Sequence, residues 1–455
     1  MRSFKIFMVA VVMVGMSAAG YAELQNVEIG GSIRIRGNHF DFGQVRTGLF
    51  SESNNQASFW EQRTRLNVTA DFTDDVTAFI ELDNYSEWGN SFRSDYISGI
   101  DFVGTADVAM YQAYIQADNM WGTDLSMRIG RQEISLGSEW LVGVNDASSI
   151  FTGLSFDGIR FDYTTDTFVV TGIYSKLVET FGDVFQDDVN FYAVYGSYTG
   201  LEDITIDAYW MLVSDDEAMT AFDVDIHTVG LRGAGTVGAF DFEAEVAYQF
   251  GEAELDGLFF DADVDVDALG ANVELGYTFD VAMQPRIFLG AAFFEGPEFD
   301  DGFFGLFAGG QDTLAFNRMF SNWEYTEFFA NTEESNMIIY RAGVSFLPTE
   351  TVSLLITASY FQADETNQTI NILGFGPDSD DDLGIEVGVY ADYQYSEDLV
   401  FRAGYAHFFA GDGSQDGQPV LFNGLGNFTN GFDALFFEDD ADDFDYFFFE
   451  AEIAF

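Results

Sequence analysis

Apolar and polar residues alternate one by one through many separate segments of this chain. The segment FDFEAEVAYQF (residues 240–250) has Phe, Ala, Val or Tyr at every second position, with Asp, Glu, Glu, Ala and Gln between them. Successive side chains of an extended strand point to opposite sides, so such a segment has one apolar and one polar face. The same pattern occurs in RTRLNVTADFT (63–73), DVTAFIELDNY (75–85) and GIEVGVYADYQY (384–395). Segments of about ten residues with this period are typical of transmembrane β-barrel strands.

Eighteen such segments predict an all-β protein, a transmembrane antiparallel β-barrel of 18 strands. They begin near residues 27, 58, 75, 107, 124, 153, 167, 187, 202, 224, 239, 265, 285, 337, 351, 383, 398 and 444. Eight links are short: FTDD, NMWGTD, TTDT, TGLED, TVGA, DVAMQ, LPTE and YSED. Nine longer links alternate with them, including residues 41–56, 89–106, 296–336, 364–382 and 411–443. This alternation of short and long links predicts short periplasmic turns and long extracellular loops.

The first 22 residues are expected to be a secretory signal peptide. Arg2 and Lys5 flank the start of the apolar run IFMVAVVMVGM, and the small residues of SAAGYA predict cleavage after Ala22. The run is too short to span a membrane as a helix. Residues 23–455 would then form a single barrel domain in the outer membrane of a Gram-negative bacterium. The chain has no cysteine, which excludes thiolate metal sites.

Acidic residues outnumber basic ones by 77 to 17, giving a net charge of −60. Nucleic-acid binding is excluded, because it requires a basic surface. The predicted loops are especially acidic, and residues 411–443 contain eight acidic residues and no basic one. Such loops are candidates for Ca²⁺ binding, and DGSQDG (412–417) has the opening spacing of a calcium loop. The twelfth position is Asn423 instead of glutamate, so we favour a solvated rim over a metal site.

The last segment, DYFFFEAEIAF (445–455), follows the same alternation. Phe447, Phe449 and Phe455 would face lipid, while Glu450 and Glu452 would point into a wet lumen. An aromatic end of this kind resembles the last strand of bacterial outer-membrane proteins. That resemblance implies that Phe455 is an assembly signal, read by the barrel assembly machinery.

Three longer stretches resemble the alginate export porin family of Gram-negative outer membranes. They are FWEQRTRLNVTADFTDDVTAFIELDN (59–84), LSMRIGRQEISLGSEWLVG (125–143) and LGIEVGVYADYQYSEDLVFRAGYAHFFAGD (383–412). The resemblance implies an eighteen-stranded, monomeric channel without a cofactor. It also implies a lumen lined with arginines, since the known exporter of the family carries an anionic polyuronate.

Side chains at alternate positions of a strand share one face, and we call this rule strand parity. It places nine arginines on the polar, lumen-facing side of the predicted strands: Arg34, Arg36, Arg63, Arg65, Arg128, Arg160, Arg232, Arg341 and Arg402. The facing of Arg131, near a strand end, stays open. Guanidinium groups match carboxylates, so these arginines are candidate ligands for an anionic solute. Alternatively, they pair with carboxylates of the lumen wall, and we favour this interpretation because buried charges are normally paired. The candidate carboxylates are Glu61, Glu81, Asp83, Asp118 and Glu386.

Two features separate this chain from a polyuronate exporter. The link YSED (395–398) is a tight turn, whereas the resemblance implies a longer periplasmic plug at that place. The strongly negative field would also repel a polyanion at the mouth. The sequence therefore predicts a passive channel for small solutes or ions that favours cations. The alternative is an exporter or uptake channel for an anionic polysaccharide or a sugar acid.

Other classes of protein remain as alternatives. A soluble all-β protein could also alternate, and an acidic surface protein could bind cations through its loops. A barrel enzyme would require a histidine beside a nucleophile, but His39, His227 and His407 are far apart in sequence. We therefore predict no enzymatic activity, no cofactor and no metal site. The expected partners are outer-membrane lipid, the assembly machinery and small solutes or cations, with Ca²⁺ as a candidate at the acidic loops.

Overall fold

The computed structural model describes the strands and parts of the links between them. The described residues are 24–41, 56–89, 108–144, 146, 153–179, 188–216, 222–256, 261–298, 313–328, 334–366, 380–415, 419–421, 434–436 and 443–455. The expected signal peptide and most of the long links lie outside these ranges.

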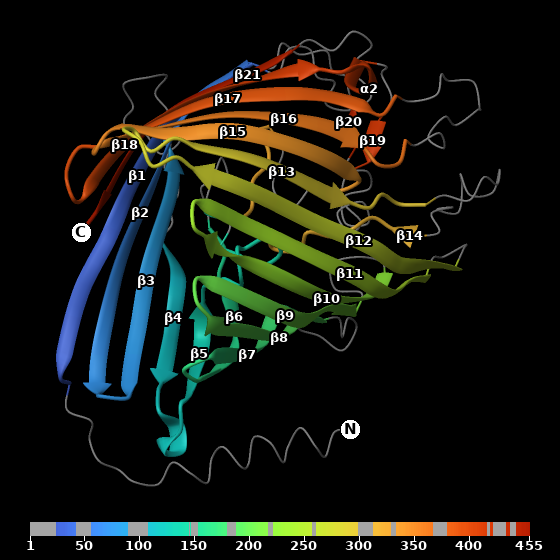
Figure 1. Ribbon diagram of the computed structural model, residues 1–455. Coiled ribbons are helices and arrows are strands. Elements are labelled where there is room, and N and C mark those ends of the chain that lie inside the picture. The colour runs from blue at the N-terminus through green and yellow to red at the C-terminus, as the bar shows by residue number, and fades with distance from the viewer. Residues whose placement is uncertain are drawn as a thin grey trace, which may run out of the picture.

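Eighteen antiparallel strands close into one barrel (Figure 1). The strands are β1 (Asn26–Asp41), β2 (Gln56–Thr73), β3 (Val76–Glu87), β4 (Ala109–Ala117), β5 (Leu125–Gln132), β6 (Phe156–Thr164), β7 (Phe168–Glu179), β8 (Asp188–Leu201), β9 (Ile204–Asp216), β10 (Phe222–Val237), β11 (Phe240–Asp256), β12 (Asp261–Thr278), β13 (Arg286–Phe294), β15 (Met337–Thr349), β16 (Val352–Ala363), β17 (Asp382–Gln394), β18 (Leu399–Ala410) and β21 (Phe444–Ala454). Each pairs with the next along the chain. The barrel closes where β21 pairs with β1, from Ser32 opposite Ala454 to Asp41 opposite Asp445.

A few short elements accompany the barrel. The two-residue strand β14 (Thr313–Leu314) pairs in parallel with β12, and β19 (Pro419–Leu421) pairs with β20 (Ala434–Phe436). A 3₁₀ turn, η1 (Met120–Gly122), lies between β4 and β5, and a single helical turn, α2 (Asp412–Gln415), follows β18. None of the helices in the described ranges has the length and apolar character needed to cross a membrane.

The predicted strand order is confirmed. All eighteen strands begin within four residues of the expected positions, and the largest difference is at β12, which starts at Asp261 instead of near residue 265. All eight short links connect neighbouring antiparallel strands as predicted. The alternation was a reliable guide because the period of two is a local property of an extended backbone.

The outer face of the barrel is apolar, as the alternation predicts. Ile115, Leu231 and Leu289 are 57%, 58% and 64% exposed there, which is the arrangement expected of a lipid-facing surface. On β21, Phe447 and Phe449 are exposed on this outer face. The expectation of a wet lumen around Glu450 is wrong, because this side chain points inward but is completely buried.

Two of the long links fold back into the barrel. The first inward segment (residues 133–144 and Asp146) follows β5, and the second inward segment (residues 313–328) lies between β13 and β15. Both contain fully buried aromatic side chains, Trp140 in the first and Phe316 in the second. Both contact inward-facing side chains of the strands, and we call the pair the strap.

Candidate functional site

The two segments of the strap are joined to each other by main-chain hydrogen bonds. The amide of Gly143 donates to the carbonyl of Phe320 (2.8 Å), and the amide of Phe320 donates to the carbonyl of Leu141 (2.9 Å). The amide of Asn322 donates to the carbonyl of Glu139 (2.9 Å), and its side-chain amide donates to the Glu139 carboxylate (2.5 Å). These bonds satisfy backbone groups that would otherwise be buried without partners. The strap is therefore one folded unit.

One side of the strap packs on an apolar part of the lumen wall. Trp140 lies 5.9 Å from the ring of Phe294 on β13 and 5.8 Å from the ring of Phe316. Its indole N–H donates to the Tyr325 hydroxyl (3.0 Å), which donates to Asn272 on β12 (2.9 Å). Burial of these large rings, with their polar atoms hydrogen-bonded, fixes this side of the strap to the wall. We call it the anchored side.

The opposite part of the lumen carries a cluster of five arginines, which we call the arginine wall: Arg34 and Arg36 on β1, Arg63 and Arg65 on β2, and Arg402 on β18. Glu450 on β21 holds three of them together. One of its oxygens accepts from the Nε atoms of Arg34 and Arg36 (both 2.8 Å), and the other accepts from Arg402 (2.6 Å). The carboxylate thus connects β18, β21 and β1, the strands that close the barrel.

The tip of the strap reaches the arginine wall through Asp146. Its main-chain carbonyl accepts from Arg34 (3.0 Å), and its carboxylate accepts from both Arg63 and Arg65, the latter at 3.2 Å. The Asp146 amide donates to Asn322 of the second inward segment (2.9 Å). Charge-assisted bonds of this kind are among the stronger polar contacts in proteins. The strap is consequently anchored by packing at one side and held by ion pairs at the other.

Aromatic rings support two of these arginines from the wall side. The guanidinium carbon of Arg65 lies 3.9 Å from the centre of the Tyr111 ring, and that of Arg36 lies 4.6 Å from the Phe448 ring. The Tyr111 hydroxyl donates to Glu133 of the first inward segment (2.7 Å). Cation–π contacts of this type orient a guanidinium group without neutralising its charge.

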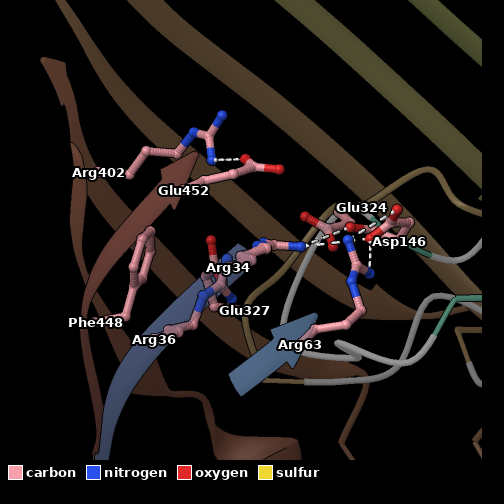
Figure 2. Close-up of a pocket in the computed structure, with 9 residues that line it drawn as sticks. All are labelled: Arg34, Arg36, Arg63, Asp146, Glu324, Glu327, Arg402, Phe448 and Glu452. Atoms are coloured by element: carbon pink, nitrogen blue, oxygen red, sulfur yellow. Dashed lines mark hydrogen bonds and ion pairs between the residues drawn. The ribbon is translucent and has the colours of Figure 1, made fainter. Parts of the chain in front are cut away.

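Between the strap and the arginine wall lies a cavity of about 350 Å³. Figure 2 shows the side chains that line it, with guanidinium and carboxylate groups converging from the wall and from the strap. The lining consists of Phe448 with four arginines and four acids, namely Arg34, Arg36, Arg63, Arg402, Asp146, Glu324, Glu327 and Glu452. This polar cavity, with equal numbers of basic and acidic side chains, is the candidate constriction of the lumen.

The remaining predicted arginines lie on other parts of the lumen wall. Arg128 donates to Gln116 (2.8 Å), Arg160 pairs with Asp162 (2.8 Å), and Arg232 pairs with Asp207 (2.7 Å). Arg341 on β15 lies near the second inward segment and contacts the Phe288 ring (5.4 Å). The expected set of arginines is therefore distributed around the lumen, and only five of the nine come together.

The expected carboxylate partners were mostly wrong. Among the described residues, only Asp83 of the five pairs with an arginine, namely Arg65 at 3.7 Å. Side chains without charge donate to the other four: Asn38 and Tyr85 to Glu61, Asn67 and Gln112 to Glu81, Gln116 to Asp118, and Thr326 to Glu386. Strand parity identifies the face of a residue, but it does not say which inward side chains meet.

Arg131 faces outward near the end of β5. It pairs with Asp157 at 2.6 Å, and the two side chains are 44% and 53% exposed. The three histidines also lie on outward-facing strand positions and do not meet: His39 contacts Ser58, His407 contacts Asp445, and His227 lies against the Phe250 ring. They form no shared site.

The candidate calcium loop is only partly described. Asp412–Gln415 forms the helical turn α2, while Asp416 and Gly417 lie outside the described residues. Within the ranges that the structure describes, no group of three or more His, Asp or Glu side chains is arranged to hold a metal ion.

Several residues of the constriction could not be located from strand parity. Asp146, Glu324 and Glu327 belong to links without a period of two, so the alternation assigns them no face. One signal was present: both links contain apolar residues, among them those of EWLVG (139–143) and LAFNRMF (314–320). Apolar runs inside a predicted loop indicate that the loop packs against something.

Comparisons with known proteins agree with this architecture. A sequence model of the family described as alginate export matches residues 25–427. No curated protein matches the chain in sequence.

Solved outer-membrane porins share the fold at low identity. OccK8 (OprE) of Pseudomonas aeruginosa is 12% identical, with a TM-score of 0.55 over 94% of this chain and 98% of that chain. OpdL of the same organism is 11% identical, with a TM-score of 0.57 over 94% and 99%. OprD, also from that organism, is 12% identical, with a TM-score of 0.54 over 96% and 98%. This chain is an outer-membrane β-barrel and belongs to the alginate export family.

Proposed function

We propose that the protein is a passive channel for small polar solutes and ions, with its constriction between the strap and the arginine wall. The observation that carries this proposal is the cavity of about 350 Å³, which is lined by charged groups on both sides. Solutes that diffuse through such a lumen are selected by pore size and by the charges at the narrowest place.

We propose a preference for cations. The lining of the cavity contains four arginines and four acidic side chains, so neither type of residue outnumbers the other at the constriction. The chain as a whole has a net charge of −60, which raises the concentration of cations at the mouth. We therefore expect the net charge of the whole chain, rather than the charges at the constriction, to determine the preference of the pore for cations.

The reversal potential of the refolded protein in a planar bilayer tests this proposal. Under a tenfold KCl gradient, a cation-preferring pore gives a potential of the sign expected for K⁺. The preference should weaken at high ionic strength, because surface charge is screened over about 10 Å at 0.1 M salt. A folded protein that forms no conducting pore would contradict the channel function itself.

The arginine wall favours a second candidate function, the passage of an anionic sugar acid or polysaccharide. Five guanidinium groups on adjoining strands could guide carboxylates one after another. A reversal potential with the sign expected for Cl⁻ would favour this candidate over the cation-preferring channel. Block of the KCl current by an oligouronate, but not by a neutral oligosaccharide of equal length, would support it further.

We infer that the channel performs no covalent chemistry and functions as a monomer in the outer membrane of a Gram-negative bacterium. The exposed apolar outer face supports contact with lipid, and Phe455, 63% exposed beside that face, is the proposed contact for the assembly machinery. Size-exclusion chromatography with light scattering would test the monomer, and truncation of Phe455 would test the assembly signal through the yield of folded barrel.

A further inference from the structure

A second, smaller cavity adjoins the constriction on the other side of the strap. Its volume is about 170 Å³, roughly ten times the space that one water requires. Glu324 and Glu327 of the strap line both cavities, while Arg341, Thr357 and Glu386 come from the barrel wall. The cavity is therefore a lined compartment between the strap and the strands β15, β16 and β17.

Two ionisable side chains of opposite type in this compartment form no ion pair and no side-chain hydrogen bond with the described residues. Arg341 forms no ion pair, and its Nε is buried without a hydrogen bond. Glu324 has neither a hydrogen bond nor an ion pair, and its Oε1 is buried. The two groups line the same cavity but form no ion pair with each other. An unpaired buried charge is costly, so a ligand that pairs with Arg341 and with the ionised form of Glu324 would be stabilised.

Other groups of the compartment define what it can bind. Thr357 is 6% exposed, and its hydroxyl has no partner within the described part of the chain. Glu386 is already occupied, because it accepts from the Thr326 hydroxyl, and the Tyr390 hydroxyl donates to Glu327. The groups left for a ligand are thus one guanidinium, one carboxyl and one hydroxyl.

We propose that this second cavity binds a small dipolar solute, whose carboxylate pairs with Arg341 and whose ammonium group pairs with Glu324. A ligand with only one charge would leave the other side chain unpaired. The inference deepens the proposed channel function, because it places a solute site directly beside the constriction and names a class of solute for it.

Three probes that each contain four carbon atoms test the proposal: 4-aminobutanoate, butanoate and n-butylammonium. Their block of single-channel current is measured on the full mature protein at 0.1 M salt and pH 8.5. We expect 4-aminobutanoate to bind about tenfold more tightly than either singly charged probe, as one additional charge-assisted contact would provide. Calorimetric titration of the folded barrel in detergent measures the same binding without requiring a conducting pore.

Substitutions test separately how Glu324 and Arg341 contribute to binding. Glu324→Gln should weaken binding of 4-aminobutanoate about tenfold and leave butanoate unchanged, and it breaks no ion pair among the described residues. Arg341→Gln should also weaken 4-aminobutanoate but leave n-butylammonium unchanged. The matched control is Glu274→Gln, another inward carboxylate, because its partner Arg286 keeps a second ion pair with Asp241. This control should bind all three probes like the wild type.

The outcomes distinguish the site from the channel. If the pore conducts but binds all three probes equally, or if the two cavity variants behave like Glu274→Gln, the proposed site is wrong and the channel stands. If calorimetry shows the expected order of affinities but no pore conducts, the channel is wrong and the site stands.

Discussion

The two sides of the lumen hold the strap in different physical ways. On the anchored side, Trp140 and Phe316 are fully buried against β13, and the polar atoms of Trp140 and Tyr325 are hydrogen-bonded. On the side of the arginine wall, the strap contacts guanidinium groups through charged side chains: Asp146 lies among Arg34, Arg63 and Arg65, and Glu133 pairs with Arg65 at 3.5 Å. Apolar packing is insensitive to salt, whereas ion pairs at a water-filled cavity are screened. The anchored side therefore fixes the position of the strap, and the charged side sets what can pass.

This difference predicts that the largest effect comes from the anchored side. Trp140→Ala removes a completely buried indole, and such substitutions cost about 3–5 kcal/mol. The strap should detach from the wall, giving larger and noisier single-channel currents and faster cleavage of the strap by proteases. Trp121→Ala is the control, because Trp121 is 82% exposed in the turn η1. Equal currents from both variants would show that the strap does not depend on Trp140.

Within the arginine wall, the largest effect is expected at Glu450. Glu450→Gln removes the completely buried charge that binds three arginines, and breaking such a network costs about 3–5 kcal/mol. Because the network spans β18, β21 and β1, the loss should lower the temperature at which the barrel opens, measured by heat-dependent gel mobility. Glu452→Gln is the control: its side chain is 27% exposed and, within the described ranges, its one ion pair is with Arg402, so the cost should stay below about 1 kcal/mol.

Asp146→Asn tests the contact between the strap and the arginine wall. The substitution keeps the shape but removes the negative charge that faces Arg34, Arg63 and Arg65. The reversal potential should shift toward Cl⁻, and the shift should be largest at low salt. The protein should remain folded, because Trp140 and the main-chain bonds of the strap are unchanged.

The control for this substitution is Asp157→Asn, whose aspartate pairs with Arg131 on the outer face. It should leave the reversal potential unchanged. An equal shift in both variants would mean that overall charge, rather than the position of Asp146, determines selectivity.

The sequence predicted the strands of the barrel well, but it did not predict the strap or which charged side chains meet inside the lumen. Strand parity assigned the lumen face to Arg34, Arg63 and Arg402, because the alternation of an extended chain is local. It could not assign Asp146, whose contact with the arginine wall depends on how the strap packs inside the barrel. The pairing of Glu450 with three arginines likewise depends on the closure of β21 against β1. Local patterns predict strands and faces, while tertiary packing decides which charges meet.

The smallest expected effect is a pH dependence at Glu324, which lies in the strap rather than in a strand. Burial raises the pKa of Glu324 to about 8, and the nearby carboxylate of Glu327 raises it further, whereas Arg36, Arg34 and Arg341 oppose the shift. Below pH 8 this carboxyl is therefore mainly protonated in the empty cavity. An ammonium group beside it favours the charged form, so binding of 4-aminobutanoate should release a proton at pH 7.

The affinity for 4-aminobutanoate should accordingly rise as the pH increases from 6 to 8 and become constant above it. Each pH unit below the pKa costs about a factor of ten, because only the ionised carboxyl binds the ammonium group. Calorimetry in two buffers of different ionisation enthalpy measures the proton release directly. In Glu324→Gln both the proton release and the pH dependence should disappear. If they persist in this variant, a different group titrates, and the strap does not bring a proton-coupled charge to the second cavity.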